Sequence, residues 1–169
     1  NQPAQPTASG WAAVRDAQRR AVQGDPNAGL AVTIDIGSPY NIHPTNKKEI
    51  GHRLTHAARN TVFGHDVTPG SPLPTGATRE GDAIAVPFQQ VEGSLVAYSH
   101  DAPIGFELCG ESGCHFADAE IDGNRVLLTA DEVDEPTRVR YCWADSPVCT
   151  LYDEAGLPAS PFEVGIDEN

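Results

Sequence analysis

The chain has 169 residues, of which 16 are glycine and 14 are proline, and it contains no methionine. This many turn-forming residues excludes a helical bundle or a coiled coil and favours a loop-rich α/β or all-β protein. With 11 basic and 24 acidic side chains the net charge is −13, which repels phosphate backbones, so we do not expect a nucleic-acid partner.

A helix is predicted at the start of the chain. Ser9 can act as its N-cap, and Gly24 with Pro26 can end it. An apolar stripe at helical spacing is expected to pack into the protein, and it comprises Trp11, Val14, Ala17, Ala21 and Val22.

A strand and a second helix are predicted next. The apolar, β-branched run 29–36 is typical of a strand that is buried on both faces. Asn46 and Glu49 form a capping box that opens a helix over 46–60. Such a strand needs parallel neighbours to satisfy its backbone, so we expect this chain to be a fragment of a larger α/β domain or one of two chains.

The second half of the chain has a different character. Residues 1–78 carry seven basic and five acidic side chains, whereas 79–169 carry four basic and nineteen acidic ones. Segment 67–78 is rich in proline and glycine and is predicted to be a linker. Short strands with turn signals follow, including a hairpin at Asp122 and Gly123, and they predict an antiparallel β-sandwich-like region over 79–169.

Four cysteines lie in two close pairs, Cys109 with Cys114 and Cys142 with Cys149. Two local disulfides are the simplest interpretation, and they predict a secreted or periplasmic protein. The alternative is a zinc site, but these spacings match no common zinc motif. The chain opens on polar residues, so we expect any signal peptide to have been removed already. No apolar run approaches the roughly 20 residues that cross a bilayer, so no membrane partner is expected.

The best candidate for chemistry is His43, in the loop that follows the predicted strand. Open α/β sheets place their sites at this end of a strand, and an imidazole can exchange a proton near neutral pH. Pro44 restricts the backbone directly after it. The alternative is an ordinary solvent-exposed loop histidine.

The motifs IHPTNK and GLPASPF, with the run 29–59, resemble the C-terminal part of the sialate O-acetylesterase family of SGNH/GDSL-type carbohydrate esterases. The resemblance runs in patches over nearly the whole chain. It implies that residues 1–66 are the closing end of an SGNH-type α/β/α parallel-sheet domain. It also implies an esterase without cofactor or metal that removes acetyl groups from sugars by serine chemistry.

The resemblance assigns the role of catalytic base to His43. Asp35 is the nearest carboxylate upstream; it either orients the imidazole or is structural, since the D-x-x-H position of many SGNH enzymes holds Tyr40 here. Tyr40 is the candidate for lining the sugar site. The family's Gly-Gln-Ser-type nucleophile block is absent from the sequence, and Ser38 lacks a suitable setting, so the serine is expected on an N-terminal portion of the same protein.

Other functions remain open at this stage. His52 and His56 lie four residues apart on the second helix and could bind zinc, although the glutamate of an HExxH motif is missing. The acidic half alone suggests a non-catalytic carbohydrate-binding or structural β module. For an esterase, the acetylated carbohydrate is either a sialic acid or a plant polysaccharide such as xyloglucan or xylan.

Overall fold

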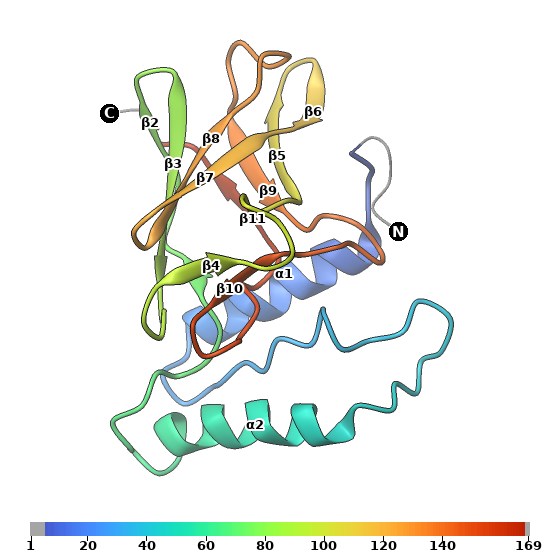
Figure 1. Cartoon of the computed structure of the whole chain (residues 1–169), viewed down its shortest axis with the longest axis vertical. Helices are drawn as coiled ribbons and strands as arrows, with labels where there is room; N and C mark the ends of the chain where they lie inside the picture. Colours follow the sequence, from blue (N-terminus) through green and yellow to red (C-terminus); the bar gives the residue numbers. More distant parts are fainter. Residues whose placement is uncertain (1–5, 168–169) are drawn as a thin grey trace.

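The computed structural model describes residues 6–167 as two helices followed by antiparallel β-sheets (Figure 1). Helix α1 (Gly10–Gln23) lies against the sheets, and α2 (Lys47–Thr61) lies farther from them. The predicted caps are confirmed, because Ser9 accepts a hydrogen bond from the amide of Ala12 and Asn46 accepts one from Glu49. Local capping signals therefore fix where both helices begin.

The predicted apolar stripe of α1 is not its buried face. Trp11 and Val14 are 64% and 46% exposed, whereas Ala12, Asp16 and Arg19 are buried. Asp16 and Arg19 pair at 2.7 Å, and Asp16 also accepts a bond from the amide of Glu163 in the sheet. Asp16 and Arg19 can be buried because each meets the hydrogen-bonding needs of the other. The prediction that the apolar stripe is the buried face of α1 was therefore wrong.

The predicted strand over 29–36 is also wrong. This segment is irregular and turns at Ile34 and Asp35, and Val32 is buried at 6% exposure. A strand exists only where another strand accepts its backbone hydrogen bonds, and the described residues offer 29–36 no such neighbour. The SGNH-type parallel sheet is therefore not formed by residues 6–167 themselves.

The remaining residues form the β region, in which every strand pair is antiparallel. One sheet has the order β1-β3-β8-β7 with β2 also on β3, a second has the order β11-β9-β5-β6, and β10 pairs with β4. The strands are β1 (Leu73–Pro74), β2 (Thr78–Glu80), β3 (Ala83–Gln89), β4 (Leu95–Ala97), β5 (Phe106–Gly110), β6 (Gly113–Phe116), β7 (Asp118–Asp122), β8 (Arg125–Thr129), β9 (Arg138–Tyr141), β10 (Leu151–Asp153) and β11 (Phe162–Gly165).

The core lies between the two larger sheets, which confirms the predicted sandwich-like region. Val86 and Leu128 of one sheet share a buried cluster with Phe106, Tyr141 and Phe162 of the other. The rings of Phe106 and Tyr141 lie 4.5 Å apart. The Tyr141 hydroxyl accepts a hydrogen bond from the amide of Leu151, and burial raises the pKa of this hydroxyl far above its ordinary value. This phenol is thus a neutral core group.

The segment predicted as a linker, 67–78, takes part in this packing. Leu73 is 3% exposed, and β1, which lies within the segment, pairs with β3 outside it. Its proline and glycine content therefore does not make it a free tether. The division of the chain into 1–66, 67–78 and 79–169 stays a prediction.

Both predicted disulfides are present. The bond between Cys109 and Cys114 joins β5 to β6, and the bond between Cys142 and Cys149 closes the loop after β9. Trp143, inside that loop, is 7% exposed. The guanidinium of Arg140 lies over its indole, with Cζ 4.8 Å from the ring centroid. This tryptophan belongs to the packed interior.

One carboxyl group is buried in the second sheet. Glu107 of β5 is 2% exposed, and its Oε2 makes no hydrogen bond with the described residues. Burial raises the pKa of Glu107 to about 7; neighbouring Arg140 lowers it and Glu163 raises it further. Arg140 cannot cancel the effect of burial because its Nε donates to Glu163 at 2.6 Å.

We expect Glu107→Gln to remove a loss of stability at high pH. The pKa of Glu107 is about 7 in the fold against 4.5 for the free group, so the folded state binds more protons and the natural protein loses stability as pH rises through this window. Above pH 7 the variant should be more stable by roughly 3 kcal/mol, and near pH 4 the two should be equal. Urea unfolding from pH 4 to 8 measures this, with the exposed Glu120→Gln as control. Parallel pH curves for Glu107→Gln and the natural protein would contradict it.

Candidate functional site

His43 lies exposed in the loop that joins segment 29–36 to α2. Its backbone amide donates to the side chain of Asn41 at 2.9 Å, which makes a tight turn directly before it. The ring makes no hydrogen bond to any other residue between 6 and 167. The imidazole is therefore available to a reaction partner.

A salt bridge anchors the start of this loop. The guanidinium of Arg53 on α2 grips Asp35 with two hydrogen bonds, of 2.6 and 2.8 Å, and a third bond of 2.6 Å goes to the carbonyl of Val32. The side chains of Arg53 and Asp35 are only 4% and 17% exposed. A bidentate pair with this little water contact defines the backbone path of the segment.

The same arginine also contacts the end of the loop. Arg53 donates through Nε to Glu49 at 3.1 Å, and the amide of Glu49 bonds to Asn46, the residue that caps α2. Burial lowers the pKa of Arg53, but hydrogen bonds and attraction from Asp35 and Glu49 outweigh it and raise the pKa overall. Both ends of loop 36–46 are thus tied to one permanently charged side chain.

The structure does not bring Asp35 to His43. Both carboxylate oxygens of Asp35 bond to Arg53, and no hydrogen bond or ion pair joins Asp35 to the imidazole within the described part of the chain. Of the two interpretations open for Asp35, the geometry favours the structural one. Sequence reasoning missed Arg53, because its partner Asp35 lies 18 residues away and no spacing rule connects them.

Tyr40 projects from the same loop into solvent. It is 91% exposed, and neighbouring Ile42 is 89% exposed. The amide of Tyr40 donates weakly to Ser38 at 3.4 Å, which keeps Ser38 inside the turn. Tyr40 is free to contact a ligand, and its role in sugar binding stays a prediction.

The two helix histidines border the same small hollow, but each ring has a different partner. His56 Nε2 lies 2.6 Å from the carbonyl of Thr68, whereas His52 Nδ1 lies 3.8 Å from Glu49. Among the described residues, Glu107, Cys109 and Cys114 come close enough to share an ion, but both sulfurs are in a disulfide and are not thiolate ligands. The geometry offers no support for a zinc hydrolase.

The β region reaches the Arg53 anchor through β10. Tyr152 stacks on Tyr98 with ring centroids 4.4 Å apart, and burial raises the pKa of its hydroxyl, with the charge of Asp35 adding to this rise. Leu157 and Ala155, which follow β10, line a small hollow with residues of α2. Strand β10 and the turn after it therefore lie near Asp35 and beside α2.

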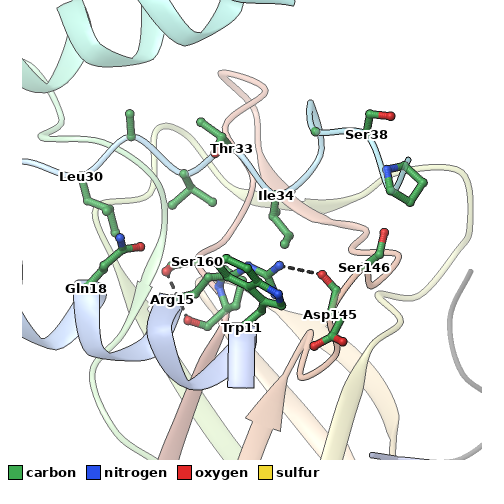
Figure 2. A pocket seen from close by; sticks show the side chains of 15 residues that line it. Trp11, Arg15, Gln18, Leu30, Thr33, Ile34, Ser38, Asp145, Ser146 and Ser160 are labelled. Carbon is green, nitrogen blue, oxygen red and sulfur yellow. Dashed lines mark hydrogen bonds between the residues drawn. The ribbon is translucent and has the colours of Figure 1, made fainter. Parts of the chain in front are cut away.

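A cavity of about 420 Å³ opens between α1, segment 30–39 and the disulfide loop 142–149 (Figure 2). Trp11 and Gln18 line it from α1, and Asp145 and Ser146 line it from the loop. Arg15 spans the two, donating 2.7 Å bonds to the carbonyls of Ala144 and Asp145. Burial lowers the pKa of Arg15, and Asp145 partly restores it. The sequence had suggested only a packing role for Trp11.

We expect Arg53→Ala to release the His43 loop. The change leaves Asp35 and the Val32 carbonyl without their donor, and it should lower the free energy of unfolding by roughly 2–3 kcal/mol. Limited proteolysis of the natural protein and the variant should show faster cleavage within 36–46. Arg59→Ala, an exposed arginine on the same helix, is the matched control and should change little. Equal cleavage rates in Arg53→Ala and the natural protein would show that Arg53 is not the anchor.

The chain is similar to solved structures of known proteins. No family model matches the chain, and no curated protein matches it. Among solved structures, a carbohydrate acetylesterase from Xanthomonas citri is 37% identical with a TM-score of 0.85, over 91% of this chain and 36% of that one. The chain thus spans about a third of the length of that neighbour. The match to this acetylesterase therefore includes nearly the whole fold, both the His43 loop and the β region.

Proposed function

We propose that this chain is part of a carbohydrate O-acetylesterase, which removes acetyl groups from sugar hydroxyls. The observation that carries the proposal is the likeness, at 37% identity over 91% of the chain, to a carbohydrate acetylesterase. The exposed imidazole on an anchored loop supports it independently, because ester hydrolysis needs a proton acceptor near neutral pH.

In the proposed mechanism His43 is the general base. It takes the proton of a serine hydroxyl as the serine oxygen attacks the acetyl carbonyl. The bond to the sugar oxygen then breaks, and the imidazolium returns the proton to that oxygen. Water, activated by the same imidazole, releases acetate and restores the serine. Asp35 contributes by fixing the loop through Arg53, so the imidazole and serine act as a dyad or with a further acceptor.

The serine is proposed to lie on an N-terminal portion of the same protein, as a separate chain or a further segment. Two features support this. Segment 29–36 has the composition of a buried strand but lacks strand partners among the described residues. Leu54, Val62 and Phe63, on α2 and just after it, are 55%, 70% and 68% exposed. A further layer of α/β structure would satisfy both, and it would complete the predicted SGNH-type sheet.

The proposed location is secreted or periplasmic. Two disulfides between cysteines close in sequence are typical of proteins that mature in oxidising compartments. Neither helix among the described residues is long and apolar enough to cross a bilayer. The substrate class is an acetylated carbohydrate.

We expect His43→Ala to lower kcat at least about 100-fold in the intact protein, because a general base supplies rate factors of that order. The assay is acetate release from acetylated xylan and from 4-nitrophenyl acetate. His65→Ala, another exposed histidine, is the control and should retain full activity. An unchanged rate in His43→Ala would exclude the role of His43, and no acetate release by the natural protein would favour a non-catalytic carbohydrate-binding module.

Chelators and serine reagents should separate the two hydrolase mechanisms. We expect EDTA to leave acetate release unchanged and a fluorophosphonate to abolish it, because the proposed nucleophile is a serine activated by an imidazole. Loss of activity in EDTA with restoration by zinc would instead support a metal site at His52 and His56.

A further inference from the structure

We propose that the cavity between α1, segment 30–39 and the loop 142–149 is a binding subsite for an uncharged sugar ring, with Trp11 as its stacking platform. The proposal rests on the proposed function for its biological meaning, but the site is argued from its own geometry. Its volume of about 420 Å³ falls within the roughly 300–1,000 Å³ of small-molecule sites.

Trp11 is a large side chain on the first turn of α1. It is 64% exposed although it borders a cavity, and Figure 2 shows its indole under Ile34 of the opposite wall. The buried face of α1 is made by Ala12, Asp16 and Arg19, so the indole is not needed for packing the helix. An aromatic face left open in a hollow can stack on the C–H face of a pyranose.

The wall formed by loop 142–149 is held by a disulfide and by hydrogen bonds to α1 and its N-cap. The disulfide between Cys142 and Cys149 closes the loop, and Arg15 bonds two of its carbonyls at 2.7 Å. Ser9 donates to the carboxylate of Asp145, also at 2.7 Å. A site held in this way loses little conformational freedom when a ligand binds.

Unused polar groups line the same cavity. The side chains of Gln18, Thr33 and Ser146 make no hydrogen bond to another described residue. Amide and hydroxyl groups donate and accept, as the hydroxyls of a sugar do. Stacking from one side with neutral hydrogen-bonding groups around it suits a saccharide better than an apolar ligand.

The charges of the cavity favour a neutral sugar. Arg15 is the one cation among the described lining residues, and its two terminal nitrogens already bond to carbonyls. Asp145 adds a negative charge beside it. A sugar that carries a carboxylate, such as a sialic acid, would find no free counter-charge there. Ser38, which also lines the cavity, is five residues before His43, so the subsite adjoins the proposed catalytic loop.

Tryptophan fluorescence of the intact protein tests the site directly. The chain has two tryptophans, and Trp143 is only 7% exposed, so iodide quenching of this chain reports on Trp11. Variants Trp11→Phe and Trp11→Ala identify its signal within the intact protein. We expect xylotetraose to protect this signal from iodide and N-acetylneuraminic acid not to protect it. An indole that iodide cannot reach without sugar, or equal protection by both sugars, would overturn the proposal.

Steady-state kinetics give a second test of the subsite. We expect Trp11→Ala to raise KM for acetylated xylotetraose about tenfold or more. Val14→Ala is the matched control, because Val14 is exposed on the same helix but does not line the cavity. An unchanged KM in Trp11→Ala would overturn the subsite. A natural protein without esterase activity would defeat the proposed function alone, and the fluorescence result would still decide the subsite.

Discussion

The grip of Arg53 on Asp35, Val32 and Glu49 is the constraint on which the candidate site depends. A guanidinium that is 4% exposed is costly to bury, and it is stable here only because several acceptors surround it. Those acceptors lie on both sides of loop 36–46, so satisfying the charge also closes the loop on α2. The two ends of the loop that carries the exposed imidazole are therefore fixed by the solvation needs of a buried cation.

Where the signals are local, the sequence predicts this protein well. The helix caps at Ser9 and Asn46, the hairpin over β7 and β8 and both disulfides need only neighbouring residues, and all are confirmed. The sandwich-like region follows from short alternating strands between turns. Several of its shorter strands, such as β1 and β10, were missed because two or three residues give no readable period.

Where a feature depends on distant partners, the sequence is insufficient. The run 29–36 has the apolar content of a central strand, but composition does not say whether neighbouring strands are present. The buried face of α1 is polar because Asp16 meets Arg19 and the amide of Glu163, a partner far along the chain. The apolar periodicity of α1 predicted that Trp11 packs into the protein, but in the fold Trp11 is exposed and lines a cavity. The anchor formed by Arg53 is likewise visible only in three dimensions.

The anchored imidazole is proposed to serve a serine carried by another portion of the protein. A crystal structure of the intact protein, inactivated with a fluorophosphonate, would show which histidine pairs with that serine. We expect the phosphonate on a serine whose Oγ lies about 3 Å from a ring nitrogen of His43, with the ends of loop 36–46 still bound to Arg53. A modified serine paired with a different histidine, or an imidazole of His43 facing away from it into solvent, would exclude this pairing.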